Sequence, residues 1–394
     1  DAARALVSVH VFGLGGLAGI PDDKHTDAPC ASGVLFFVHG DTLKETLLLN
    51  LPEYPQENFF RPVSGADAPA WEQEDPFADG REEPYGLLDY LTWQSRRPLL
   101  YPQRDASGRI KVMQYKLAPG LRIGGNVEDP QKTYRMSKQG GLVPLRFSED
   151  KGLWRDSAAL FNFDETDDNA TRAPRTFAWL AYLVRNLEES VGLSRSKTYR
   201  CLAMGLSKDR GKMLFTRRET LPLLPAYLSD TDLVEKLTSA LSDTEKSARS
   251  VLRAVRVAGM HIHIAQAEQV KWRKYGIHLK ASQSIHKEEE KEIEDWVSHA
   301  GVERAYWASL DVPFQEFVVR LPTDREGARI DWQQTLEDAA YGAFDKIALY
   351  AGDDGRSLKA LVYGRQALAY SLRQDLPLIH QQVEQQPTAE EVSL

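Results

Sequence analysis

The sequence changes character at one place, and this change constrains the fold more than any other feature. Before residue 221, short apolar runs alternate with clusters of Pro, Gly and Asp, a pattern typical of short strands, short helices and loops. Pro222 and Pro225 mark the change. After them, apolar residues recur at helical spacing almost to the end, as in Leu252, Val255 and Ile262. We therefore expect an α+β mixed globular domain over residues 1–220, followed by an all-α four-helix bundle over residues 221–380.

Local patterns predict the individual elements of the two regions. In the first region we expect strands over residues 5–12, 34–39 and 110–115, and helices over 42–51, 87–94 and 175–187. In the second region, Asp230 or Thr231 starts a helix through Leu241, and Asp243 with Thr244 opens another. A third helix covers about 285–310, and the last two cover 332–350 and 356–373 around a turn at 352–355. The polar, acidic tail at 381–394 is expected to fray.

Composition excludes several classes of protein. A hydrophobic fraction of 42% and a charged fraction of 27% among 394 residues are typical of a globular chain with two or three domains. The longest apolar stretches, at 34–38 and 47–51, are far shorter than the ~18 residues that span a bilayer, so no membrane association is expected. Cys30 and Cys201 form no C-x-x-C pair, which argues against a cysteine zinc site and fits a reducing compartment. With no readable signal peptide after Asp1, we expect a cytoplasmic protein.

The distribution of charge indicates a local polyanion site on an acidic chain. The net charge is −8, but residues 95–147 hold eleven Lys and Arg against three acidic residues, and residues 195–218 hold eight against one. These two basic islands carry +8 and +7. A globally acidic protein can bind phosphate at such islands, although solvated surfaces without a partner explain them equally well on charge alone.

Motifs for small ligands, metals and catalysis are weak. Residues 13–18 match G-x-G-x-x-A, but a turn at 20–23 stands where a dinucleotide fold needs a helix, so a flexible glycine loop is the preferred interpretation. His261 and His263 are two residues apart and fall on different helix faces, which suits core histidines better than metal ligands. The charged run at 286–290 is typical of a solvated helix start. Because no signature of a hydrolase, metalloenzyme or nucleotide-binding loop is found, we expect a binding protein rather than an enzyme, with no cofactor and no metal.

Two loops within the basic islands are the best candidates for function. In residues 129–135, a Pro-initiated turn precedes Lys132 and an aromatic residue, so that the lysine could project from a loop. The second loop is short, polar and cationic, and its glycine permits close backbone approach. It consists of Ser207, Lys208, Asp209, Arg210, Gly211 and Lys212. Such a loop can enter a DNA minor groove and insert a side chain into the base stack.

An ordered series of motifs carries a family resemblance. The strings GDTLKETLLLNL at 40–51, PAWE at 69–72 and PYGLLDYLTWQSRR at 84–97 come first. Asp-Pro at 129–130 with Tyr-Arg at 134–135, VPLR at 143–146 and LWRD at 153–156 continue the series. By these motifs the chain resembles the CasA family, the large subunit of the type I-E CRISPR surveillance complex Cascade. The resemblance covers about residues 5–220 by motif and the C-terminal bundle by architecture, and we expect the family's N-terminal portion to lie outside this sequence.

The resemblance implies a fold, a function and a set of partners. It implies a mixed α/β domain with a C-terminal four-helix bundle, and a non-catalytic subunit that checks double-stranded DNA for a PAM from the minor groove. It also implies that the subunit promotes strand opening for guide-RNA pairing and helps recruit a nuclease–helicase. The implied partners are target DNA, the guide crRNA and the other Cascade subunits: the backbone, the small subunit and the subunit at the crRNA 5′ end.

The family's PAM-reading elements map onto both basic islands. Lys132 matches the lysine finger, and Asp209, Arg210, Gly211 and Lys212 match the wedge loop, with Lys208 beside it. Arg210 stands where the family has a glutamine. The family's glycine loop falls between Gly13 and Gly33 without a unique match.

Two other functions stay open from the sequence. One is a scaffold subunit that binds only RNA and protein, whose basic islands serve the guide. The other is a nucleotide-dependent enzyme at the 13–18 glycine loop.

Overall fold

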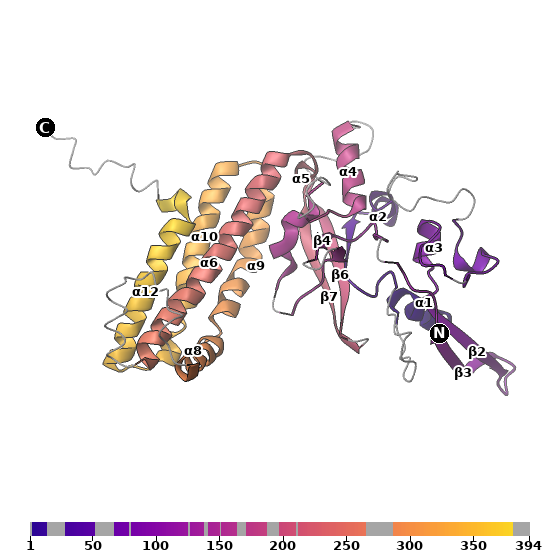
Figure 1. Cartoon of the computed structure of the whole chain (residues 1–394). Helices are drawn as coiled ribbons and strands as arrows, with labels where there is room; N and C mark the ends of the chain where they lie inside the picture. Colours follow the sequence, from indigo (N-terminus) through magenta and orange to yellow (C-terminus); the bar gives the residue numbers. More distant parts are fainter. Residues whose placement is uncertain are drawn as a thin grey trace. The chain divides into compact units, whose positions relative to one another are not determined.

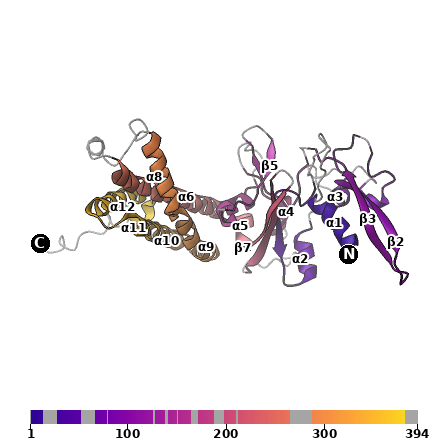
Figure 2. The same ribbon diagram turned by 90° about the horizontal axis from the view of Figure 1, so that it is seen from below.

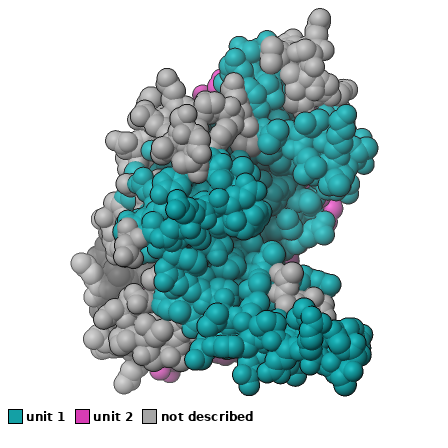
Figure 3. All heavy atoms as spheres, turned by 90° about the vertical axis from the view of Figure 1, so that its right-hand side faces the viewer, with its two compact units in different colours: residues 1–229 teal, residues 230–394 magenta. Residues whose placement is uncertain are grey.

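The computed structural model divides into two compact units, residues 1–229 and 230–394 (Figure 1). Within them it describes residues 2–13, 28–51, 67–78, 80–124, 127–137, 141–149, 151–163, 171–186, 197–209, 212–264 and 287–380. The boundary expected at 220/221 falls inside a strand, and the units divide nine residues later, between Ser229 and Asp230. Figure 3 shows the surface of unit 1 (teal) from one side, where separate lobes border a recess.

A three-stranded antiparallel sheet forms the centre of unit 1. Its order is β1 (Val34–His39), β6 (Tyr199–Asp209) and β7 (Lys212–Leu223). β1 is buried on both faces, since Val34 and Phe36 on one face have no solvent exposure and Leu35 on the other is 8% exposed. Register is defined by pairs such as Val34 with Gly205 and His39 with Arg200. A short pair, β4 (Tyr134–Met136) and β5 (Leu142–Pro144), is joined to this sheet through the hydrogen bond from Val34 N–H to the carbonyl of Leu145 (2.8 Å).

Short helices surround the strands of unit 1. They are α1 (Ala2–Phe12), α2 (Leu43–Leu49), α3 (Leu87–Leu91), α4 (Arg175–Asn186) and α5 (Ala226–Ser229), with 3-10 helices at Ala70–Glu72 and Leu153–Leu160. Thr42 caps α2, since its side chain accepts from the N–H of Glu45. The strand expected at 5–12 is wrong: these residues form α1. Its last carbonyls are satisfied by distant side chains, as Ser95 Oγ donates to His10 and Arg96 Nη2 donates to Gly13 (3.1 and 3.0 Å).

A separate two-stranded ribbon carries most of the first basic island. It consists of β2 (Arg96–Arg104) and β3 (Ile110–Pro119), which among the described strands pair only with each other and extend away from the other strands of unit 1 (Figures 1 and 2). The N–H of Gly120 donates to the carbonyl of Ser95, so Ser95 and every second residue after it direct their backbone groups toward β3. The backbone nitrogens of Pro98 and Pro102 therefore point away from β3. β2 was not predicted, because two prolines interrupt its sequence pattern.

Unit 2 consists of helices. They are α6 (Thr231–His263), α8 (Lys287–His299), α9 (Val302–Arg320), α10 (Arg325–Asp345), α11 (Ala348–Ala351) and α12 (Gly355–Asp375). The long helix α6 packs against α12, α10, α8 and α9, and α10 also packs against α9 (Figure 1). The fold is thus a mixed α/β unit followed by a helical unit, as expected.

Several helix boundaries in unit 2 differ from those expected. The helix expected over 332–350 begins earlier, at Arg325, and ends at Asp345, before the short α11. Asp243 and Thr244 do not open a new helix but lie inside α6, because their side chains find partners on α10: Asp243 accepts from Gln333 Nε2 (2.9 Å) and Thr244 Oγ1 accepts from Trp332 Nε1 (3.2 Å). The helix expected at 285–310 is broken at Gly301, whose φ of 60° lies in the left-handed region. The turn expected at 352–355 is present between α11 and α12, and Gly352 there has φ 84°.

Candidate nucleic-acid interface

The central sheet places the two candidate segments on opposite sides of β1. Lys132 forms an antiparallel bridge with Leu35, and Leu35 pairs on its other side with Met204 of β6. The N–H of Phe36 also donates to the carbonyl of Gln131 (2.8 Å). Residues that are far apart in the sequence are therefore held on either side of one short strand.

The β6–β7 hairpin continues past the end of β1. The last residue of β1 in this direction, Val34, pairs with Gly205, whereas β6 and β7 stay paired as far as Asp209 and Lys212. A loop was expected at residues 207–212, but residues 207–209 belong to β6 and Lys212 to β7. Arg210 and Gly211, and the side chains of Lys208, Asp209 and Lys212, lie outside the described residues.

The prediction that Lys132 projects from its loop is wrong. Its side chain is only 5% exposed, and its Nζ donates to the carbonyl of Pro29 at 2.5 Å. The same Nζ lies 3.4 Å from Oδ2 of Asp129, which is 4% exposed. The lysine is buried because the Asp-Pro turn folds it back against the segment before β1, and a buried ammonium needs such partners.

Asp129 is the centre of the buried polar group around Lys132. The hydroxyl of Tyr90 donates to Asp129 Oδ2 at 2.6 Å, and the N–H of Gln131 donates to Oδ1 at 2.8 Å. The backbone N–H of Asp129 donates to the hydroxyl of Tyr134 (2.7 Å). Burial, together with the nearby carboxylate of Asp129, raises the pKa of Tyr90 well above its ordinary value and raises that of Tyr134 as well. Both phenols are therefore neutral hydrogen-bonding groups at neutral pH.

A glycine allows the chain to pass close to Lys132. Gly33 has φ 85°, and a Cβ atom there would lie 2.8 Å from Cβ of Pro144 and 3.3 Å from Cδ of Lys132. On the opposite side, a Cβ at Gly205 would lie 3.0 Å from the carbonyl oxygen of Gly33. Lys132, Gly33 and the start of the extended part of the hairpin therefore lie together at one end of the sheet.

A cavity of about 450 Å³ opens beside this group. Its polar lining comes from Lys132, Glu128, Tyr90 and Ser32. Other lining residues include Ala28, Ile123, Val127, Tyr134, Met136, Leu142 and Pro144. Glu128 also pairs with Arg172 at 3.0 Å, so its charge is already partly balanced.

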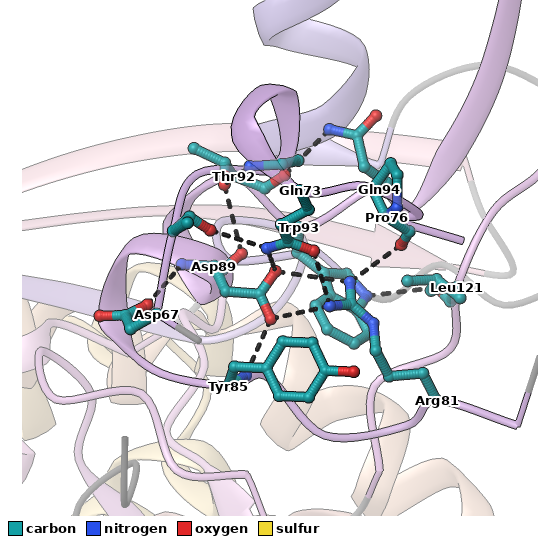
Figure 4. A network of polar contacts seen from close by, with 12 residues as sticks. Asp67, Gln73, Pro76, Arg81, Tyr85, Asp89, Thr92, Trp93, Gln94 and Leu121 are labelled. Carbon is teal, nitrogen blue, oxygen red and sulfur yellow. Dashed lines mark hydrogen bonds and ion pairs between the residues drawn. The ribbon is translucent and has the colours of Figure 1, made fainter. Parts of the chain in front are cut away.

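A second buried network fixes the helix that carries Tyr90 (Figure 4). Asp89 has no exposure and accepts from Arg81 Nη1 (3.1 Å), Gln73 Nε2 (2.8 Å) and the N–H of Tyr85 (2.8 Å). The guanidinium of Arg81 lies over the rings of Tyr85 and Trp93, at 4.9 and 4.8 Å from their centroids. Since Tyr90 follows Asp89 in α3, this network holds the tyrosine that binds Asp129.

One face of the β2–β3 ribbon consists of exposed residues. Residues directly opposite each other in the register share a face, and one face holds four such pairs. All eight of its residues are exposed: Arg97, Leu99, Tyr101 and Gln103 with Ala118, Lys116, Gln114 and Lys111. We call this set the open face. It has three cationic residues and no acidic residue. On the other face Pro98, Leu100, Val112 and Leu117 are half-buried, whereas Pro102, Arg104, Ile110 and Tyr115 are exposed.

The described residues show no metal site and no membrane segment. No group of three or more His, Cys, Asp or Glu side chains among them is arranged to hold a metal ion. None of the described helices has both the length and the apolar composition for crossing a bilayer. His261 stacks on Tyr363 and His263 meets the edge of Trp296, so that the two histidines contact different helices.

Comparison with known families identifies the chain. The model of the family described as CRISPR-associated protein Cse1 matches residues 1–343. The chain belongs to the Cse1 (CasA) family. Its resemblance to CasA in sequence motifs is thereby confirmed. A Cse1-family relative, CRISPR-associated protein CasA/Cse1 of Thermus thermophilus, is 31% identical over 380 residues, which are 93% of this chain and 67% of the relative.

Solved structures of the family share its fold. The crystal structure of CasA from Thermus thermophilus matches with a TM-score of 0.70 and 26% identity, over 95% of this chain and 72% of that one. A chain from a structure described as a CRISPR RNA-guided surveillance complex matches with a TM-score of 0.61 and 22% identity, over 94% of this chain and 68% of that one. The mixed α/β fold with many helices is therefore the Cse1 fold.

Sequence reasoning missed most of the residues that build this interface. Tyr90 and Asp89 lie within a recognised motif, but nothing in the motif shows that they hold Asp129 in place. Gly33 gave no signal apart from being a glycine. The open face gave no clear signal in the sequence, because polar and apolar residues do not alternate along β2 and two prolines interrupt it.

Proposed function

We propose that this chain is the large, non-catalytic subunit of a CRISPR RNA-guided surveillance complex, and that it recognises a PAM in double-stranded DNA from the minor groove. Membership of the Cse1 family carries this proposal. The β6–β7 hairpin supports it, because its cationic end extends beyond β1 and is free of sheet neighbours among the described strands. In this function the subunit promotes strand opening for guide-RNA pairing and helps to recruit a nuclease–helicase.

The end of the hairpin supplies the groove contacts in this proposal. Lys208 and Lys212 flank Asp209, Arg210 and Gly211, and a narrow minor groove attracts cations most strongly. Arg210 acts as the wedge that separates the first base pair. Unstacking costs a few kcal/mol per base step. Because minor-groove readout is degenerate, such a site accepts several related PAM sequences.

Lys132 has a supporting role in the same proposal. In its buried position it holds the Pro29–Gly33 turn beside the hairpin, as its bond to the Pro29 carbonyl indicates. A direct contact with DNA requires that the Nζ exchange Pro29 and Asp129 for a phosphate or a base edge. The lysine finger is therefore proposed as a residue that is released on binding.

Unit 2 is proposed to be the family's four-helix bundle, formed by α6, α9, α10 and α12. The packing of α6 on the other three supports this assignment. Its proposed partners are the neighbouring subunits, namely the backbone, the small subunit and the subunit at the crRNA 5′ end. The guide crRNA and the recruited nuclease–helicase complete the set of partners.

A scaffold that binds only RNA and protein is the second candidate function. The burial of Lys132 favours it, because a buried lysine contributes nothing to the encounter with DNA. The two candidates differ in whether the subunit itself contacts the PAM duplex.

The deciding experiment measures strand opening by the assembled complex. A fluorescent base is placed beside the PAM, and opening is compared with and without this subunit, then with Arg210→Ala, Arg210→Gln and the control Arg218→Ala, which removes a charge from an exposed position on the same hairpin. We expect loss of opening without the subunit, slowed opening with Arg210→Ala, and near-normal opening with Arg210→Gln and Arg218→Ala. Equal rates for Arg210→Ala and the unchanged chain, with PAM binding independent of the subunit, would support the scaffold instead.

A further inference from the structure

The open face of the β2–β3 ribbon has the composition of a nucleic-acid surface. Its exposed side chains are Arg97, Lys111 and Lys116 for charge, Gln103 and Gln114 for hydrogen bonding, and Tyr101 and Leu99 for stacking and apolar contact. The absence of an acidic residue among these eight described positions contrasts with the net charge of −8 on the whole chain. Such a face is complementary to a polyanion.

Tyr101 lies between two cations on this face. It pairs with Gln114, and the adjacent pairs on the same face are Leu99 with Lys116 and Gln103 with Lys111. Lys116 lies diagonally across the ribbon from Tyr101, at the roughly 7–8 Å typical of such neighbours, and is within reach of a phosphate next to a base stacked on that ring. A β-bulge between Tyr101 and Pro102 separates the ring from the next pair on this face, which holds Lys111. The ring is 37% exposed and is thus available for stacking.

The cations of the open face are available to a polyanion. Lys111 is 54% exposed, and its ion pair with Asp105 at 3.1 Å is at the surface, where such pairs contribute about 0–1 kcal/mol. Arg97 is held over the ring of Phe77 at 4.1 Å and is still exposed. A phosphate can therefore approach both without a large loss of existing contacts.

We propose that the open face binds single-stranded DNA, with Tyr101 stacking on a base and Lys111 and Lys116 contacting phosphates. An exposed tyrosine and leucine favour unpaired bases, because a duplex hides its base faces from stacking. The choice of DNA over RNA rests on the proposed function, since a subunit that opens duplex DNA works beside an unpaired DNA strand. The site itself is separate from the β6–β7 hairpin and is carried by its own ribbon.

The test measures binding of a fluorescent thirty-nucleotide oligo(dT) to the full 394-residue chain by anisotropy over a series of salt concentrations. Tyr101→Ala should weaken binding by about 5- to 150-fold, the range for one lost base–aromatic stack. Tyr101→Phe should keep the affinity, because the ring remains. Lys116→Gln should reduce the slope of log affinity against log salt by about 0.7, the value for one contact on a single strand.

Matched controls lie on the opposite face of the same ribbon. Tyr115 is 68% exposed, more than the 37% of Tyr101, and Arg104 is exposed, so Tyr115→Ala and Arg104→Gln remove a more accessible ring and a charge from that face. Both should leave oligo(dT) binding unchanged, with thermal unfolding of all variants used to verify folding.

Several results would overturn the proposal. They are absent oligo(dT) binding, an equal loss for Tyr115→Ala and Tyr101→Ala, tighter binding of oligo(rU) than of oligo(dT), or tighter binding of a duplex of equal length. These outcomes are independent of PAM-directed strand opening by the assembled complex. If oligo(dT) binding fails, the proposed function in PAM recognition is unaffected. If PAM-directed strand opening fails, oligo(dT) binding still tests the open face independently.

Discussion

Lys132 and Asp129 form an ion pair with almost no exposure, and such a pair behaves differently from a cation at a surface. Both charges have left water, and their stability depends on the hydrogen bonds from Tyr90 and Gln131 and to the Pro29 carbonyl. Removing one partner leaves the other charge buried without compensation. A substitution at Lys132 is therefore expected to lower the stability of the fold. Any loss of DNA affinity should follow from that lower stability.

Lys132→Ala should lower the free energy of unfolding by about 3–5 kcal/mol, the usual effect of breaking a buried pair. Urea unfolding followed by circular dichroism measures this directly. Lys116→Ala, which removes an exposed lysine from the same unit, should change it by less than about 0.5 kcal/mol. If Lys132→Ala were as stable as the unchanged chain while losing DNA affinity, the lysine would act at the surface of the free protein rather than from a buried position.

Alkaline pH should destabilise the protein. The pKa values of Tyr90 and Tyr134 are raised by burial, and burial also raises the pKa of Cys30 to about 11. Groups with raised pKa values contribute stability that is complete below their unfolded-state pKa, ~8.5 for cysteine and ~10 for tyrosine, and that is lost as pH rises. The free energy of unfolding should thus fall between about pH 8.5 and 11, more steeply above pH 10, where the tyrosines join. Tyr90→Phe should make this decline shallower, and a flat profile would contradict the prediction.

At the scale of elements, the close approach of α12 to α6 and α10 depends on a glycine. A Cβ atom at Gly364 in α12 would lie 2.7 Å from Cζ of Phe344 in α10 and 2.9 Å from the carbonyl oxygen of Ala254 in α6. Three helices therefore meet at a position without a side chain. Gly342 in α10 is the opposite case, because nothing lies within 4 Å of its would-be Cβ.

Substituting these two glycines should change stability in opposite directions. Gly364→Ala should lower the free energy of unfolding by about 1–3 kcal/mol through overpacking. Gly342→Ala should raise it by up to about 1 kcal/mol, because alanine is the better helix former and meets no neighbour. Thermal and urea unfolding of the two variants provide the comparison. Stabilisation by Gly364→Ala would show that the helices are not this close.

Some elements could be predicted from the sequence because their signals are local. β1, α2 and α4 follow from apolar runs, a Thr cap and helical spacing, and each was expected within a few residues. α1 was mistaken for a strand because its valines favour strands, while the side chains of Ser95 and Arg96 that satisfy its end come from far along the chain. The continuity of α6 likewise depends on Gln333 and Trp332.

The candidate site was predicted less completely than the fold. Family motifs led to Lys132 and residues 208–212 as candidates, and these remain a prediction. The burial of Lys132 depends on Pro29, Tyr90 and Asp129, which only the tertiary structure brings together. The open face emerges only once β2 and β3 are known to pair, since the register decides which residues share a face.

At the scale of the whole molecule, each unit has its own core. In unit 2, the buried aromatic residues Tyr306, Phe314, Trp332 and Phe344 come from α9 and α10, and α6 contributes buried leucines and valines. Asp230 caps α6 by accepting from the N–H of Leu233 (3.1 Å), so a natural helix start lies at the unit boundary. These features indicate that the helical unit is a folding unit.

A fragment covering residues 229–380 should fold alone. Circular dichroism should show high helix content and a cooperative thermal transition, since the helices bury their apolar faces on one another. The fragment should bind neither PAM duplex nor oligo(dT), because both proposed nucleic-acid sites lie in unit 1. Tight binding of either DNA by the fragment would place a DNA site on the helices.

The two prolines of β2 have a consequence for how copies of this chain meet at high concentration. The outward positions of Pro98 and Pro102 have no N–H, so the free edge of β2 lacks two of the donors that an incoming strand would need. The free edge of β3 has no such interruption before Pro119. Edge-to-edge growth into an extended sheet is thus blocked on one side of the ribbon, and pairing through β3 alone would stop at two copies instead of propagating into a fibre.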